Sequence, residues 1–208
     1  MKTLIGIPCM DMVPTPFMQS VLCLRYPPNC EITLASGSLI YDARNNIAKK
    51  AIKDGFDQVL WLDSDMIFET DLLTRLQAHL DAGAEFVTGI YFARKKPIQP
   101  VIYESVSVTN EGGGYSAEIT PYRQYPQDSV FEIEGCGFGC VMLKTSVIER
   151  VRGTYGLPFF PGMGLGEDLA FCYRARELGI KIICDSSIKT KHIAYYPVSE
   201  ETYQKGEF

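Results

Sequence analysis

The sequence predicts an α/β fold with a mixed, mainly parallel central sheet flanked by helices. Through residue 91, short apolar runs alternate with segments of helical periodicity, which is the pattern of strands joined by crossover helices. Glycines end several of the helical segments. After residue 91, glycine- and proline-rich turns separate short apolar runs, so we expect a small antiparallel part in the second half.

The first half contains four predicted strands and three predicted helices. The strands are the apolar runs at residues 2–7, 32–35, 59–62 and 85–90. Between them, helices are predicted at residues 17–24, 40–54 and 72–80. In the second of these helices, Ala43, Ile47 and Ala51 recur at helical spacing, and Gly55 is a natural terminator.

In the second half, short antiparallel strands are predicted at residues 101–103, 115–119 and 130–133. A glycine-rich stretch, 135–140, leads into an apolar strand at 140–143, and Thr145 or Ser146 is placed to cap a helix over 147–151. Residues 153–166 are expected to form a flexible stretch, either a mobile lid or a plain surface loop. A helix at 168–178 and a last strand at 180–184 precede a tail expected to be poorly ordered.

The composition is that of a soluble globular protein. The 208 residues are 46% hydrophobic and 22% charged, and the net charge of −5 argues against a large basic surface for nucleic acid. We find neither an apolar run of about 18 residues, as a membrane helix needs, nor a signal-peptide pattern, so we expect a cytoplasmic protein. The seven cysteines show no zinc-type spacing and are expected to be reduced and structural.

Two carboxylates follow the predicted strand at 59–62. They are Asp63 and Asp65, separated only by Ser64. Ligands of open α/β sheets collect at the carboxyl ends of strands, and paired carboxylates there suit Mg²⁺ or Mn²⁺. An acidic turn after a strand explains the same three residues, because Asp and Ser favour turns.

A second acidic pair, Glu167 and Asp168, opens the predicted helix at 168–178 after the glycines Gly164 and Gly166. Acids are favoured at helix N-termini, so helix capping explains the pair. A carboxylate preceded by such a loop is also suited to accept a proton from a hydroxyl as a general base.

Two further residues are candidates for binding. His192 follows the last predicted strand and would complete a metal site beside Asp63 and Asp65. His79, by contrast, lies within a predicted helix and is expected to be a surface or packing residue. Arg44 opens the helix at 40–54, where it suits a phosphate or, alternatively, an ordinary solvated helix start.

Taken together and in this order, these motifs resemble the GT-A glycosyltransferases, specifically the family 2-like nucleotide-sugar transferases. The resemblance extends from Leu4 to about Ala194. It is carried by the opening strand that ends in Ile7-Pro8, the Ala43-Arg44-Asn45 helix start, Leu62-Asp63-Ser64-Asp65, Gly166-Glu167-Asp168, and the closing strand followed by His192.

The resemblance implies a GT-A (Rossmann-like) catalytic domain over residues 1–208. Residues 1–91 would be the nucleotide-binding half, 92–196 the acceptor and metal-completing half, and 197–208 a tail. Mn²⁺ or Mg²⁺ would be held by Asp63, Asp65 and His192, Asp65 foremost, with Asp63 nearer the ribose or sugar of the donor. Pro8, Cys9 and Arg44 would lie at the nucleotide, although Cys9-Met10-Asp11 departs from the family's usual loop after the proline.

The activity so implied is transfer of a hexosyl group from a nucleotide-diphosphate sugar, by default a UDP-sugar, to an acceptor hydroxyl with inversion. Asp168 would be the catalytic base and Glu167 its neighbour in the acceptor site. The acceptor is open between a saccharide, a protein side chain, a small molecule and a modified nucleobase. A modest basic region is expected at the acceptor entrance, formed by Arg94, Lys95, Lys96 and Arg123.

Two other functions fit the same fold. A GT-A-like nucleotidyltransferase would need a glycine-rich, basic phosphate loop after the first strand, and residues 8–16 contain none. A non-catalytic module that binds nucleotides or carbohydrates would have the same fold without turnover.

Overall fold

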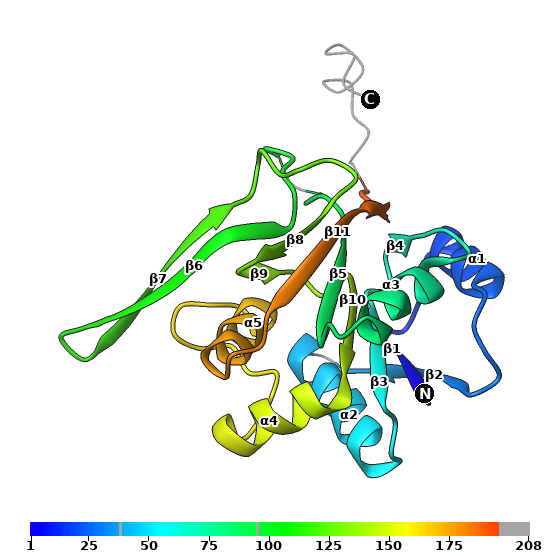
Figure 1. Ribbon diagram of the computed structural model, residues 1–208, viewed down its shortest axis with the longest axis horizontal. Helices are drawn as coiled ribbons and strands as arrows, with labels where there is room; N and C mark the ends of the chain where they lie inside the picture. The colour runs from blue at the N-terminus through cyan, green and yellow to red at the C-terminus, as the bar shows by residue number, and fades with distance from the viewer. Residues whose placement is uncertain (38, 95, 196–208) are drawn as a thin grey trace.

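The computed structural model describes residues 1–37, 39–94 and 96–195 (Figure 1). Its centre is a seven-stranded sheet with the order β2-β1-β3-β10-β5-β11-β8. The strands are β1 (Thr3–Cys9), β2 (Cys30–Ser36), β3 (Gln58–Leu62), β5 (Phe86–Ile90), β8 (Val130–Ile133), β10 (Cys140–Lys144) and β11 (Ile182–Lys189). All run in one direction except β10 and β8, which pair antiparallel with their neighbours. The predicted α/β fold with a mainly parallel sheet is therefore confirmed.

Helices cover both faces of this sheet (Figure 1). Along β3, Val59 and Trp61 belong to one hydrophobic cluster and Leu60 and Leu62 to the other, because successive strand residues point to opposite faces. The first cluster includes side chains of α2 (Ile40–Lys53), α4 (Thr145–Tyr155) and α5 (Glu167–Glu177). The second includes side chains of α1 (Thr15–Cys23) and α3 (Leu72–Asp81).

The antiparallel part is a three-stranded sheet formed by β6 (Ile102–Glu111), β7 (Gly114–Pro121) and β9 (Gly135–Cys136). The β6–β7 hairpin extends away from the body of the molecule (Figure 1) and turns at Gly112 and Gly113, which both have positive φ. The strand expected at 101–103 is much longer than predicted, because β6 pairs with β7 over its length. The strand at 130–133 joins the central sheet beside β11 and not the antiparallel part.

Several element ends differ from the sequence expectation. Helix α4 begins at Thr145 with Lys144 in the N-cap position, and no side chain caps it, so neither Thr145 nor Ser146 is the cap. Helix α2 ends as predicted, with Gly55 at positive φ directly after it. The last strand is displaced toward the C-terminus, and the tail expected to be poorly ordered lies outside the described residues. None of the described helices is long and apolar enough to cross a bilayer.

The stretch at 153–166 is anchored in its middle by Phe159. The Phe159 ring is fully buried and stacks on Phe171, with 4.6 Å between the ring centroids, and packs edge-to-face with Trp61, with 4.9 Å between the centroids. Its backbone is held as well, since the Asn45 side chain donates to its carbonyl at 2.6 Å and accepts from its N–H at 3.0 Å. Movement of the whole stretch as one lid would have to break these contacts, so they favour a fixed segment at Phe159.

Replacing Phe159 with alanine is expected to destabilise the fold by about 3–5 kcal/mol, because the change empties a fully buried aromatic site. The neighbouring Phe160→Ala variant is a matched control, since that ring is 49% exposed and its loss is expected to cost under about 1 kcal/mol. Denaturant unfolding of both variants measures the difference. Equal losses would show that Phe159 is not the anchor of this stretch.

Candidate functional site

A cavity of about 540 Å³ lies at the carboxyl ends of β1 and β3. This is the edge where an open α/β sheet places its ligands. Six predicted site residues line the cavity, namely Pro8, Cys9, Arg44, Asp63, Glu167 and Asp168. Its remaining lining is Met10, Gly37, Leu39, Ile40, Tyr41, Ala43, Ser64 and Arg94. The structure thus brings residues from five separate sequence segments to one place.

Close packing of α2 on β1 places Arg44 at this cavity. Gly6 of β1 has no side chain, and a Cβ there would lie 2.5 Å from a methyl carbon of Ile47. Glycine therefore lets the helix approach the strand. Arg44 lies three residues before Ile47 on the same helix face, so this approach buries it beside Asp63.

Arg44 joins the two acidic motifs. It is 2% exposed, its Nη2 donates to Asp63 Oδ1 at 2.8 Å, and its Nε lies 3.5 Å from Glu167 Oε1. Burial alone would lower the pKa of Arg44, but the carboxylates of Asp63, Glu167 and Asp168 raise it, so the guanidinium stays charged. The alternative of an ordinary solvated helix start is therefore wrong for this residue. The buried Arg44 guanidinium needs the Asp63 carboxylate as its counter-charge, and this pairing fixes the orientation of the Asp63 side chain.

Asp65 has a different set of partners. Its Oδ2 accepts from Arg94 Nη1 at 2.5 Å and lies 3.3 Å from His192 Nε2. His192 reaches this position through a two-stranded pairing of β4 (Met66–Ile67) with β12 (Lys191–His192). Burial would raise the pKa of Asp65, but the hydrogen bond to His192 and the charge of Arg94 lower it. The same hydrogen bond raises the pKa of His192.

The predicted metal ligands are only partly assembled. Asp65 and His192 lie together, whereas Asp63 is turned toward Arg44. Across the described residues, no group of three or more His, Cys, Asp or Glu side chains converges as a ready cation site. The pair itself suits such an ion, because His192 Nδ1 faces the Phe92 carbonyl at 3.1 Å and must carry a proton there. Without a cation, Nε2 carries the proton of the hydrogen bond to Asp65. A cation that displaces this proton would meet a lone pair on Nε2 beside a carboxylate oxygen, a donor set that fits Mn²⁺ or Mg²⁺.

Asp168 and Glu167 form the first turn of α5. Gly166 occupies the N-cap position, so neither acid is the cap residue. Asp168 Oδ1 accepts the Leu169 N–H at 2.7 Å, which leaves Oδ2 to other partners. Burial, with the charge of Glu167, raises the pKa of Asp168 to about 6. A carboxylate with this pKa is suited to act as a base near neutral pH.

Tyr91 is a site residue that the sequence interpretation missed. It directly follows β5, and its buried hydroxyl accepts the Gly139 N–H at 3.2 Å while its ring lies edge-on to His192 at 5.6 Å. A Cβ at Gly137 would lie 2.1 Å from the Tyr91 hydroxyl oxygen, so the glycines of this loop give the ring its room. Its position in the sequence could have indicated this, since Tyr91 directly follows a buried strand, as Asp63 does.

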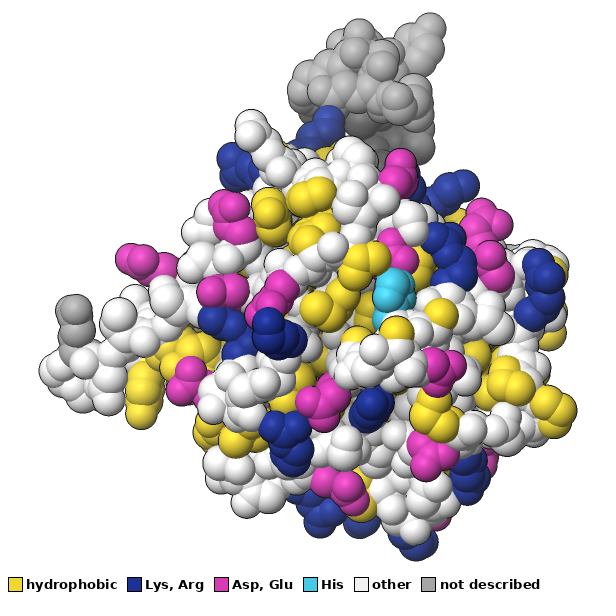
Figure 2. All heavy atoms as spheres, in the orientation of Figure 1, with side chains coloured by type: hydrophobic (Ala, Val, Ile, Leu, Met, Phe, Trp, Pro, Cys, Tyr) yellow, Lys and Arg dark blue, Asp and Glu magenta, His cyan; other side chains and the backbone are white. Residues whose placement is uncertain are grey.

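The expected basic region is divided in the structure. Arg94 lines the cavity and contacts Asp65, whereas Arg123 lines a separate hollow with Glu104 and Gln124. Lys95 lies outside the described residues. On the face shown in Figure 2, basic and acidic side chains are interspersed and form no large basic patch. His79, expected as a surface or packing residue, lies 2.8 Å from Asp185 and joins α3 to β11.

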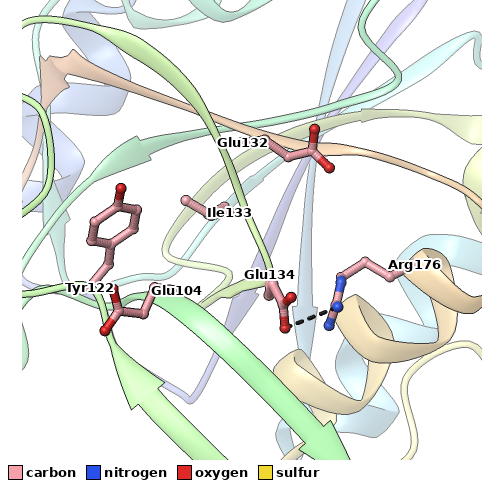
Figure 3. A pocket seen from close by; sticks show the side chains of 6 residues that line it. All are labelled: Glu104, Tyr122, Glu132, Ile133, Glu134 and Arg176. Atoms are coloured by element: carbon pink, nitrogen blue, oxygen red, sulfur yellow. Dashed lines mark ion pairs between the residues drawn. The ribbon is translucent and has the colours of Figure 1, made fainter.

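A second hollow, of about 350 Å³, contains none of the predicted site residues (Figure 3). It is lined by Glu104, Tyr122, Glu132, Ile133, Glu134 and Arg176. Glu134 lies 2.9 Å from Arg176 and accepts the Val106 N–H, while Glu132 pairs with Lys181. Two of the three carboxylates that line this hollow are therefore paired with protein cations.

Known proteins resemble this chain in fold but not detectably in sequence. No protein-family model matches the chain, and no curated protein matches it in sequence. Among solved structures, A197 from STIV superposes with a TM-score of 0.66 at 21% identity, over 94% of this chain and 87% of A197. GalNAc-T7, in a crystal structure with UDP, GalNAc and Mn²⁺, superposes with a TM-score of 0.64 at 12% identity. That match covers 95% of this chain and 44% of GalNAc-T7.

Both superpositions extend over nearly the whole chain. At these identities the likeness establishes architecture alone. The chain has a GT-A-like glycosyltransferase fold.

Proposed function

We propose that this protein is a metal-dependent glycosyltransferase of the family 2-like type. It transfers a sugar from a nucleotide-diphosphate donor, by default a UDP-sugar, to an acceptor hydroxyl with inversion. The observation that carries the proposal is the convergence, at one cavity, of Asp63 with a partly buried carboxylate, Asp168, whose pKa is about 6. Asp65 and His192 lie next to this cavity, because Arg94, which lines it, contacts Asp65, and Asp65 contacts His192. The solved structure of GalNAc-T7 with UDP and Mn²⁺ supports the ligand class.

The donor would lie along the cavity from β1 toward Asp65. Pro8 and Cys9 form the end of β1 and, with Leu39 and Tyr41, give an apolar wall for the nucleoside. Asp63, fixed by Arg44, faces the same space and can accept hydrogen bonds from ribose or sugar hydroxyls. Asp65 and His192 would hold the divalent cation, which supplies Lewis-acid stabilisation of the charge that develops on the diphosphate.

The transfer step itself is assigned to Asp168. The acceptor oxygen attacks the anomeric carbon and forms the new C–O bond, while the bond from that carbon to the phosphate oxygen breaks. The proton of the acceptor hydroxyl passes to the Asp168 carboxylate, and the nucleoside diphosphate leaves with the electron pair. Burial raises the pKa of Asp168 most, and the negative charge of the neighbouring Glu167 raises it further. Attack from the side opposite the leaving group inverts the anomeric centre.

A thermal-shift panel of nucleoside diphosphates, each with and without Mn²⁺, tests this proposal. We expect one nucleotide to raise Tm by about 5–10 °C at a concentration near 100 times its Kd, and only when Mn²⁺ is present. The matching monophosphate and an EDTA-treated sample are the controls. No stabilisation by any nucleotide would contradict the proposal, and metal-dependent binding without donor hydrolysis would instead indicate a non-catalytic binding module.

A further inference from the structure

Arg94 is placed where a bound cation would meet Asp65. Its Nη1 lies 2.5 Å from Asp65 Oδ2, the same oxygen that faces His192 Nε2. In this geometry a cation shared by Asp65 and His192 would approach that oxygen. Because a guanidinium and a metal ion carry charges of the same sign, the two compete for it.

The surroundings of Arg94 allow it to move while its loop stays in place. The loop between β5 and β6 is closed at its base by a bridge between Phe92 and Pro100 and by the Ala93 N–H donating to the Gln99 carbonyl at 2.9 Å. The Arg94 side chain is 50% exposed and lines the cavity. Arg44, the other cation among the described residues that line the cavity, is 2% exposed and held by Asp63.

A guanidinium released from Asp65 would have an anionic ligand within reach. Its planar array of donors matches the geometry of phosphate oxygens as well as that of a carboxylate. On the proposed function, the donor diphosphate lies beside Asp65, at the wall where Arg94 already stands. One side chain can therefore serve two successive partners without rearrangement of the loop backbone.

Resting on the proposed function, we propose that Arg94 exchanges partners during donor binding. Without ligand it neutralises Asp65, and when the divalent cation takes Asp65 it moves to the donor diphosphate. Arg94 is then both a competitor of the free cation and a phosphate-binding residue. The exchange couples the two ligands, because each removes a cost of binding the other, and such coupling is reciprocal.

The test measures binding of Mn²⁺ alone and then with UDP, by electron paramagnetic resonance of free Mn²⁺, in wild type, Arg94→Ala and Arg123→Ala. Arg123→Ala is the matched control, because it removes one exposed positive charge away from the cavity lining. We expect Arg94→Ala to bind Mn²⁺ about three- to fivefold more tightly than the control, as loss of an exposed ion pair allows. The factor by which UDP tightens Mn²⁺ binding is expected to fall about tenfold in Arg94→Ala.

The outcomes separate this inference from the function on which it rests. Tighter Mn²⁺ binding with weaker UDP coupling supports the exchange. If Arg94→Ala and Arg123→Ala bind Mn²⁺ equally, or if UDP coupling is unchanged, the exchange is wrong while the metal site stands. If wild type and Arg94→Ala both bind no Mn²⁺ in the presence of UDP, the proposed metal site fails and the exchange fails with it.

Discussion

Replacing Asp65 with alanine is expected to abolish Mn²⁺-dependent nucleotide binding and to lower sugar transfer by about a thousandfold or more, as loss of a catalytic cation would. The structural reason is that the Asp65 carboxylate supplies the oxygen facing His192 Nε2, and His192 alone is a poor anchor for a hard cation. The measurement is donor hydrolysis and transfer at saturating Mn²⁺, together with the thermal shift caused by Mn²⁺ and the nucleotide.

Asp81→Ala is the matched control for this change. Asp81 is an exposed acid at the end of α3 and lines a different hollow, so its loss removes one negative charge without touching the site. Asp63 is unsuitable as a control, because its removal leaves the buried Arg44 without its closest carboxylate. Asp65→Ala protein that keeps its Mn²⁺-dependent thermal shift would overturn the assignment of Asp65.

Replacing Asp168 with asparagine is expected to reduce kcat/KM by about a thousandfold while making the fold more stable above pH 6. The catalytic loss follows from removing the proton acceptor. In wild type, kcat/KM should rise with pH through about 6, where Asp168 loses its proton. Glu167→Gln should keep this rise but move it to lower pH, since the charge of Glu167 raises the pKa of Asp168.

The gain in stability follows from linkage. The pKa of Asp168 is about 6 in the folded protein against an ordinary 3.8, so the folded state binds this proton more tightly than the unfolded state. Stability therefore falls as pH rises from about 4 to about 6. Above that range the folded protein bears the full free-energy cost of the ionised Asp168 carboxylate. Asparagine carries no charge, so the variant should gain about 1–3 kcal/mol at pH 8, toward the lower figure because the carboxylate is partly exposed.

Unfolding of wild type and Asp168→Asn in EDTA, at pH 4 and at pH 8, measures this gain. The difference between the two proteins should be near zero at pH 4 and favour the variant at pH 8. A variant that is less stable than wild type at pH 8 would show that Asp168 is chiefly a structural acid at the start of α5.

The sequence was most informative where function leaves a local pattern. Asp63 and Asp65 follow an apolar run directly, and Glu167 and Asp168 follow glycines at a helix start, so both motifs were visible as strings of residues. The helices with strong apolar spacing, such as α2, were also predicted nearly to the residue. Strands β4 and β12 were missed, because two residues are too few for any periodicity.

The sequence did not show, in contrast, which side chains contact one another. Arg94 was expected in a basic region at the acceptor entrance, but its partner is Asp65. Arg44 was a candidate phosphate ligand, and burial beside Asp63 also makes it a fixed internal cation. Tyr91 was only the residue that follows the predicted strand at 85–90, and the sequence does not show that Gly137 and Gly139 lie against its ring.

The sequence by itself determined the α/β class, the order of most strands and helices, and the two acidic motifs, because each depends on neighbours within a few residues. The tertiary structure alone decided which way those acids point. Asp63 turns to Arg44 and Asp65 to Arg94 and His192, since these partners come from segments 19, 29 and 127 residues away. Side-chain orientation depends on packing and charge compensation across the sheet edge, and those contacts exist only once the chain has folded.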